Sequence, residues 1–321
     1  MAVSADKDIE RALPKLPIID AHQHFWDIGH GRYPWLEGET PIPFRYGDYS
    51  ALRRSYLPPD YRRDGSGLDI VQTVHIEAEW ERSRSVDETI WVEGLAARYG
   101  LPSACVAHAT LGAADADDVL ARQANRPLVR GIRDKPAAAA RHADARRGLP
   151  GSMDDEQWRR GYAKLSQRDL SFDLQTPWWH LDAAADLARD FPETTIIINH
   201  TGLPADRSAE GLAGWRGYLA RAADAPNTSL KISGLGQPGL PWTVESNGPV
   251  IRDAIAIFGA DRCMFASNFP VDSLVATLET VTSGFLAAIE QRSLEEQQML
   301  TSRNAVRIYR LNEITAEKLD G

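Results

Sequence analysis

Near its N-terminus the chain reads Ile18-Ile19-Asp20-Ala21-His22-Gln23-His24-Phe25-Trp26-Asp27, and this stretch decides the fold. A short apolar run ends there in two histidines that are one residue apart. Side chains two positions apart on a β-strand point to the same face, so His22 and His24 can converge at the end of a buried strand. Two imidazoles so placed suit a metal ion or a proton-handling site. The plainer interpretation is a polar strand end whose histidines only hydrogen-bond to loops.

Seven further runs have the same strand-like character. Several are rich in Val and Ile and bounded by Gly, Pro or Asp, as buried parallel strands are. Segments with helical character lie between them. This alternation predicts an α/β fold, a closed (β/α)8 TIM barrel rather than an open sheet. The predicted strands are 16–25, 70–78, 103–111, 128–133, 170–176, 194–200, 228–233 and 262–268, and the predicted helices are 85–99, 154–167, 181–190, 208–223, 272–291 and 294–311.

The length of 321 residues fits one such barrel, so we expect a single domain over residues 1–321, with residues 1–16 as a flexible N-terminus. The N-terminal residues lack the apolar core of a signal peptide, and no run approaches the roughly 18 apolar residues of a membrane span. Both cysteines, Cys105 and Cys263, sit in apolar runs. They should be buried free thiols, which favours a reducing cytoplasm.

The formal net charge of −9 argues against a nucleic-acid partner, because phosphate backbones need a basic surface. A small substrate responds only to the local field of a cleft, so the net charge says nothing about it. We therefore expect a small-molecule substrate, and neither a nucleic acid nor a membrane as partner. A homo-oligomer stays open.

Two connections between the predicted strands are long. The connection 137–153 is rich in Ala, Arg and Gly and is expected to be a mobile loop. The connection 27–69 follows the first strand, so in a barrel it lies on the carboxyl face, as a lid or a substrate wall. Equally, it could be an arm that packs on the barrel or on a second subunit. Its aromatic residues are Tyr33, Trp35, Phe44, Tyr46, Tyr49, Tyr56 and Tyr61.

Polar residues stand where several predicted strands end, which is where barrels build their active sites. His200 ends a fully apolar strand, so its imidazole should lie at the top of the barrel. Glu77 is either functional or locked in an ion pair, because a carboxylate in an apolar strand needs a partner. Arg133 suits a substrate carboxylate, or it pairs with Asp134 or Glu77. Gln175 could hydrogen-bond a ligand.

The last strand ends at Asn268, and Asp272 follows four residues later, where it could cap the last helix. His108, between two alanines, is better interpreted as a satisfied core histidine. In a barrel these strand ends meet at one mouth. Their convergence favours a functional interpretation of His22 and His24.

Four segments are informative together: His22-Gln23-His24-Phe25-Trp26, Gly131-Ile132-Arg133, Asn199-His200-Thr201-Gly202 and Ser267-Asn268-Phe269-Pro270-Val271-Asp272. In this order and spacing they resemble the metal-dependent amidohydrolase superfamily. The resemblance is strongest to its lactonase-type branch of TIM-barrel hydrolases, amidohydrolase-2, which includes sugar-acid, muconolactone and pyrone lactonases. It runs from about Ile18 to about Tyr309.

The resemblance implies that His22, His24 and His200 ligate one divalent metal ion, with zinc the expected metal, or bind substrate without metal as in some members. Arg133 stands where other members have a lysine or glutamate, which argues against a second metal ion. The residue at the end of strand 8 is usually an aspartate that acts as the base. Here it is Asn268.

That difference matters because an amide cannot take up a proton at neutral pH. Either Asp272 or Glu77 replaces the missing carboxylate, or the water is activated without a protein base. A third alternative is that the reaction is no longer hydrolysis.

The leading prediction is a hydrolase that opens the ester bond of a small lactone bearing a carboxylate or several hydroxyls. The alternatives are a non-oxidative decarboxylase or a lactone isomerase of the same superfamily. A barrel that binds a ligand without turnover belongs to a different class, and Asn268 is its main support. The predicted catalytic residues are His24, His200 and Asp272, and the predicted substrate-binding residues are Glu77, Arg133, Gln175 and Asn268.

Overall fold

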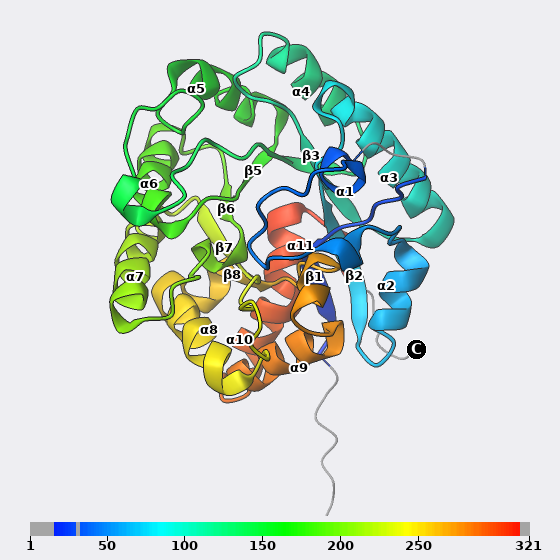
Figure 1. Ribbon diagram of the computed structural model, residues 1–321, viewed down its shortest axis with the longest axis vertical. Helices are drawn as coiled ribbons and strands as arrows, with labels where there is room; N and C mark the ends of the chain where they lie inside the picture. Colours follow the sequence, from blue (N-terminus) through cyan, green and yellow to red (C-terminus); the bar gives the residue numbers. More distant parts are fainter. Residues whose placement is uncertain (1–15, 30–32, 315–321) are drawn as a thin grey trace, which may run out of the picture.

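Eight parallel strands form the centre of the molecule in a computed structural model that describes residues 16–29 and 33–314 (Figure 1). Each strand pairs with the next one in chain order, and a bridge between Gln23 and Phe269 joins the first strand to the segment after the last. The predicted (β/α)8 TIM barrel is confirmed. The strands are β1 (Ile18–Gln23), β2 (Ile70–Ile76), β3 (Ala104–His108), β4 (Val129–Arg133), β5 (Ser171–Leu174), β6 (Ile196–Ile198), β7 (Thr228–Ile232) and β8 (Cys263–Phe265).

Helices surround the strands as an outer ring (Figure 1). Two of them, α4 and α8, have no counterpart among the predicted helices. The second turn of α8 contains Gly248 and Pro249, which in sequence are signals for a break. The helices that follow β2 are α3 (Ser85–Tyr99), α4 (Ala116–Ala124), α5 (Glu156–Tyr162), α6 (Leu181–Asp190), α7 (Ala209–Ala223), α8 (Val244–Phe258), α9 (Leu278–Ile289), α10 (Leu294–Gln298) and α11 (Asn304–Tyr309), with a π-turn at Met299–Arg303 between the last two.

Asp272 does not cap the last long helix, so that prediction is wrong. The helix α9 begins six residues later, and the side chain of Thr277 caps it by accepting a hydrogen bond from the backbone N–H of Thr280. Asp272 instead lies in a short 3-10 turn, Val271–Leu274, and is fully buried.

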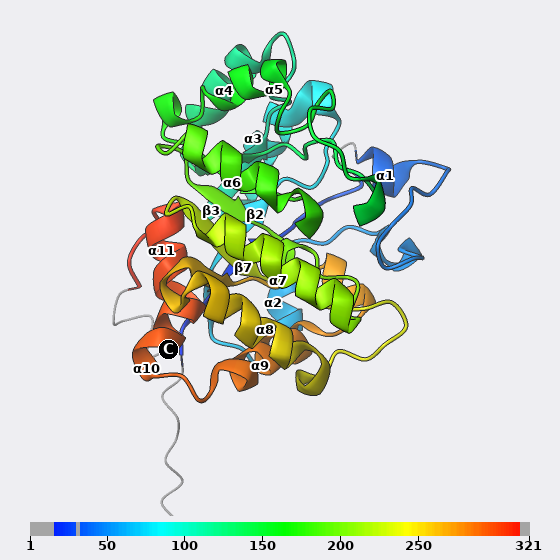
Figure 2. The same ribbon diagram turned by 90° about the vertical axis from the view of Figure 1, so that its left-hand side faces the viewer.

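Neighbouring side chains of β6 pack in different layers. Ile196 and Ile198 pack with Trp215 of α7 in the core between strands and helices. Ile197 belongs to a separate cluster with Tyr309 of α11. Figure 2 shows α11 and α1 (Pro34–Glu37) at opposite ends of the barrel. The barrel is therefore packed from one end by the C-terminal helix, which leaves the other end for a site.

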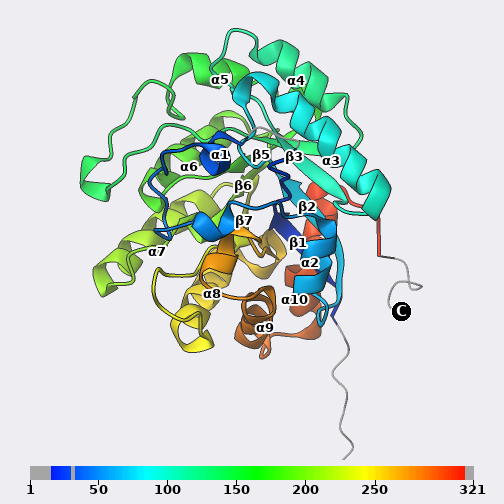
Figure 3. The same cartoon turned by 45° about the vertical axis from the view of Figure 1, so that its right-hand side comes forward.

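The connection between β1 and β2 folds onto that other end (Figures 2 and 3). It contains α1, the 3-10 turn Ser50–Leu52 and α2 (Pro58–Asp64). An antiparallel bridge between Trp26 and Tyr56 closes residues 27–55 of this connection into a loop ahead of α2. The Trp26 indole also donates a 2.7 Å hydrogen bond to the Arg54 carbonyl. Its buried aromatic side chains form one cluster with the strand end, comprising Phe25, Trp26, Tyr33, Tyr49, Tyr56 and Tyr61.

Four further predictions concern the two cysteines, the connection 137–153, the N-terminus and membrane spans. Cys105 and Cys263 are buried free thiols, as expected. The connection 137–153 is held to the barrel by hydrogen bonds from the Trp179 indole to the Ala139 carbonyl and from the Ala139 N–H to the His180 ring. The predicted flexible N-terminus lies outside the described residues except for residue 16. In the part of the chain that is described, no helix is long and apolar enough to cross a membrane.

Candidate active site

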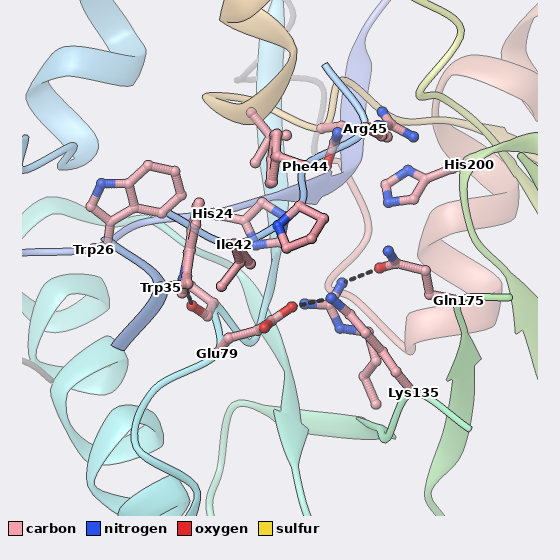
Figure 4. Close-up of a pocket in the computed structure, with 15 residues that line it drawn as sticks. His24, Trp26, Trp35, Ile42, Phe44, Arg45, Glu79, Lys135, Gln175 and His200 are labelled. Carbon is pink, nitrogen blue, oxygen red and sulfur yellow. Dashed lines mark hydrogen bonds and ion pairs between the residues drawn. The ribbon is translucent and has the colours of Figure 1, made fainter. Parts of the chain in front are cut away.

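A cavity of about 300 Å³ opens at the carboxyl ends of the strands, beneath the β1–β2 connection (Figure 4). Five of the predicted site residues line it: His24, Arg133, Gln175, His200 and Asn268. The predicted residues His22, Glu77 and Asp272 are not among its lining side chains. The remaining lining residues are Trp26, Trp35, Ile42, Pro43, Phe44, Arg45, Ala78, Glu79, Lys135 and Val271.

Three histidines meet at the barrel mouth. The Nε2 atoms of His22 and His24 are 3.2 Å apart, and the ring centres of His22 and His200 are 4.5 Å apart. His24 Nδ1 lies 2.8 Å from the carbonyl oxygen of Ile76, to which it donates, and His200 Nδ1 lies 3.0 Å from Ser233 Oγ. Burial lowers the pKa of all three imidazoles well below the usual value, and nearby cations lower it further. All three are therefore neutral near pH 7.

Directly behind His22 lies a buried lysine that the sequence did not assign to the site. Lys231 of β7 is fully buried and forms an ion pair with Asp173 of β5. The Tyr309 hydroxyl at the end of α11 donates to both carboxylate oxygens of Asp173, each at 3.0 Å. Burial lowers the pKa of Lys231 to about 8, although Asp173 opposes this shift, so the ammonium form prevails at neutral pH. Its Nζ lies 3.5 Å from His22 Nδ1.

This lysine decides whether His22 suits a metal ion. An ammonium only donates hydrogen bonds, so His22 Nδ1 accepts and the ring proton belongs on Nε2, which faces His24. A metal-ligating imidazole instead presents a bare nitrogen and donates from its other nitrogen. Asn268 contributes only a neutral amide. Within residues 16–29 and 33–314 no group of three or more His, Cys, Asp and Glu side chains could hold a metal ion. As they stand, these side chains do not fit a divalent metal.

Glu77 is held in a buried ion pair, one of the two alternatives that its sequence position left open. Its Oε1 accepts from Arg133 Nε at 2.7 Å, and its Oε2 accepts from Arg82 at 2.7 Å. Burial alone would raise the pKa of Glu77, but Arg133 and Arg82 hold it well below its usual range. Glu77 therefore stays ionised and fixes the Arg133 guanidinium, whose Nη1 also donates to Gln175 at 3.1 Å.

Asp272 accepts hydrogen bonds from polar groups on both sides of the barrel mouth. Its Oδ1 accepts hydrogen bonds from Asn268 Nδ2 at 2.6 Å, from the Tyr46 hydroxyl at 2.9 Å and from Arg45 Nη2 at 3.1 Å. Its Oδ2 is buried and has no partner among the described residues. Burial raises the pKa of Asp272, and these three donors oppose the rise. The carboxyl thus ties the turn after β8 to the β1–β2 connection.

The aromatic connection supplies one wall of the cavity, as one of its two interpretations predicted. Trp35, Ile42 and Phe44 line the cavity. Arg45 and Lys135 also line it and were not predicted from the sequence, since Arg45 lies within the long β1–β2 connection and Lys135 follows the strand end that the sequence assigned to Arg133. Lys135 forms an ion pair with Glu79 that is visible in Figure 4.

His108 is the satisfied core histidine that the sequence indicated, since its Nδ1 donates to the Arg133 carbonyl at 3.0 Å. Burial lowers the pKa of His108 to about 4. An unfolded histidine titrates near 6.5, so the unfolded state takes up the proton first as the pH falls. This group therefore contributes stability above about pH 6.5 that is lost progressively toward pH 4.

We expect His108→Gln to remove this contribution. Urea unfolding at pH 7, 5.5 and 4.5 should show the wild type losing about 1.4 kcal/mol per pH unit more than the variant below pH 6. Other buried histidines act equally in both proteins, so they cancel in the comparison. Parallel pH curves for the two proteins would contradict a neutral His108.

Comparison with known proteins identifies the family to which this chain belongs. Residues 19–311 match a family model described as amidohydrolase. A protein of Sinorhizobium fredii, y4mH, is 37% identical over 297 residues, which cover 92% of this chain and 99% of the relative. An L-fucono-1,5-lactonase of Burkholderia multivorans is 29% identical over 312 residues, 92% of this chain and 96% of that protein.

A solved amidohydrolase structure from Burkholderia multivorans, with bound zinc, superposes with a TM-score of 0.76 at 26% identity and covers 92% of this chain and 100% of that one. The chain belongs to the amidohydrolase family.

Proposed function

We propose that this protein hydrolyses a small lactone by a mechanism that uses its own side chains and no metal ion. The observation that carries the proposal is the position of the His200 imidazole, which lines the same cavity as the Arg133 guanidinium, and burial lowers the pKa of His200 so that it is neutral near pH 7. A neutral imidazole can accept a proton from water, and guanidiniums stabilise the oxyanion that forms when water attacks a carbonyl. Two relatives named L-fucono-1,5-lactonase support the same reaction class.

His200 is assigned the proton transfer because its Nε2 has no hydrogen-bond partner in the described part of the chain, whereas Nδ1 faces Ser233. When Nδ1–H donates to Ser233, Nε2 carries the lone pair. Water then loses a proton to Nε2 as its oxygen bonds to the lactone carbonyl carbon. The ring C–O bond breaks, the proton passes to the departing ring oxygen, and a hydroxy acid results.

The other polar groups hold the reactants. Arg133, held in place by Glu77 and Gln175, is assigned the stabilisation of the carbonyl oxygen. His24 accepts the Nε2 proton of His22, so the pair keeps one defined tautomer beside the reacting groups. Asp272 holds Asn268 and Arg45 in place and is a positioning residue in this scheme.

The test is a panel of carboxylated and hydroxylated lactones, assayed by proton release before and after treatment with a strong chelator. We expect hydrolysis of at least one lactone, at a rate that survives chelation. Loss of all activity on chelation, with recovery on adding zinc, would overturn the metal-free mechanism. Release of CO₂ from aromatic acids without lactone hydrolysis would identify a decarboxylase. Tight ligand binding without turnover would identify a binding protein.

A further inference from the structure

Arg45 reaches the cavity from the β1–β2 connection and lies beside His200 (Figure 4). Its guanidinium carbon lies 4.3 Å from the centre of the Tyr46 ring, and its Nη2 donates to the Tyr46 hydroxyl and to Asp272. Gly234 follows β7 with a φ of +65°. A Cβ at that position would lie 2.9 Å from both Nη1 and Nη2 of Arg45. A side chain at position 234 would therefore crowd the guanidinium where it now lies, and glycine leaves that space free.

Arg45 differs from the other cations of the cavity in the donors it leaves unused. The Arg133 side chain is only 3% exposed and donates from all three of its nitrogens to Glu77 and Gln175. Lys135 is paired with Glu79. The Arg45 side chain is 29% exposed, and its Nε and Nη1 have no partner among residues that the structure describes.

The charge that Arg45 brings is also incompletely balanced. Its partner Asp272 shares one oxygen among Arg45, Tyr46 and Asn268. A guanidinium with unused donors in a cavity is suited to a carboxylate, which it binds through two parallel hydrogen bonds. Trp35, Ile42 and Phe44 form an apolar wall in the same cavity, where ring hydroxyls would find few partners.

We propose that Arg45 determines specificity by binding a carboxylate substituent of the lactone, whose carbon ring lies against Trp35 and Phe44. The enzyme then prefers carboxylate-bearing lactones to neutral ones of the same shape. The preference in turnover that this inference predicts rests on the proposed lactonase function. The binding preference itself does not depend on turnover.

The experiment compares 5-oxotetrahydrofuran-2-carboxylate with its carboxamide, which keeps the ring and removes the charge. For wild type we expect a clear preference for the carboxylate. Arg45→Gln should raise KM for the carboxylate by about 10- to 100-fold, the effect of losing hydrogen bonds to a charged group, and leave KM for the carboxamide unchanged. Arg45→Lys should restore part of the loss. Because the group binds and does not react, kcat should change little.

Arg141→Gln is the matched control, since it removes the same charge from a side chain that is 77% exposed. Equal loss for both substrates in Arg45→Gln would indicate a structural role and overturn the proposal, as would a wild type that does not distinguish them. Calorimetric binding of both compounds is measured in parallel. If no lactone turns over, the lactonase proposal fails. A carboxylate preference that depends on Arg45 would then still uphold this inference, and its absence would refute it.

Discussion

In the variant His200→Asn, kcat/KM for lactone hydrolysis falls by about 10²- to 10⁴-fold, the usual contribution of a positioned general base. Asparagine suits this position because His200 has a φ of +55°, a backbone region that asparagine adopts more readily than most residues. Its amide can still meet Ser233, but it cannot accept a proton from water. The loss should therefore appear in kcat, with folding and substrate binding retained.

The measurement is steady-state kinetics on the best lactone of the panel, with circular dichroism and a urea midpoint as checks on the fold. His142→Asn is the matched control, because His142 is an exposed histidine of the connection 137–153 that does not line the cavity. It should retain wild-type kinetics. Full turnover by His200→Asn would remove His200 from the mechanism and return the role of base to Asp272.

Replacing Lys231 by methionine should lower the free energy of unfolding by about 3–5 kcal/mol, which is the usual cost of leaving one member of a buried ion pair uncompensated. Lys231 and Asp173 are both fully buried, so solvent does not screen the charge that is left. Tyr309 still donates to Asp173, but a neutral hydroxyl does not replace the ammonium. Urea unfolding at pH 7 measures the loss.

The double variant Lys231→Met/Asp173→Asn should recover much of that stability, because no unpaired charge remains. Arg141→Ala is the surface comparison: its pair with Asp144 is 77% and 48% exposed, and such pairs contribute about 1 kcal/mol or less. A single variant as stable as wild type would show that Lys231 and Asp173 are not ionised together in the barrel.

The strands were predictable because burial on both faces leaves a local mark in sequence, and each observed strand lies within its predicted run. The ends of the strands were predictable for the same reason. The order of the apolar runs was therefore enough to predict that His24, Arg133 and His200 lie together at one end of the barrel. The helix α8 was not predictable, because Gly248 and Pro249 in its sequence indicate a helix break. Packing on the barrel overrides that local preference.

What could not be predicted depends on contacts between distant parts of the chain. Tyr46 meets Asp272 across 226 positions, and no spacing rule links them. Lys231 was visible as a polar residue in an apolar strand, but its nearness to His22 depends on the barrel's closure. Arg45 lies in a connection whose path is set by the packing of its aromatic neighbours, so nothing in its local sequence marked it.

The β1–β2 connection has a consequence for how this enzyme could diversify. The bridge between Trp26 and Tyr56 closes residues 27–55 into a loop, so this loop can be lengthened at small entropic cost to the fold. Arg45, Trp35 and Phe44 all belong to that loop, whereas Arg133 ends β4 and His24 and His200 stand within two residues of the ends of β1 and β6. In the proposed mechanism, the residues that select the substrate and the residues that react are thus encoded in separate parts of the gene, so recombination confined to one short interval would change the substrate range and leave the reaction unchanged.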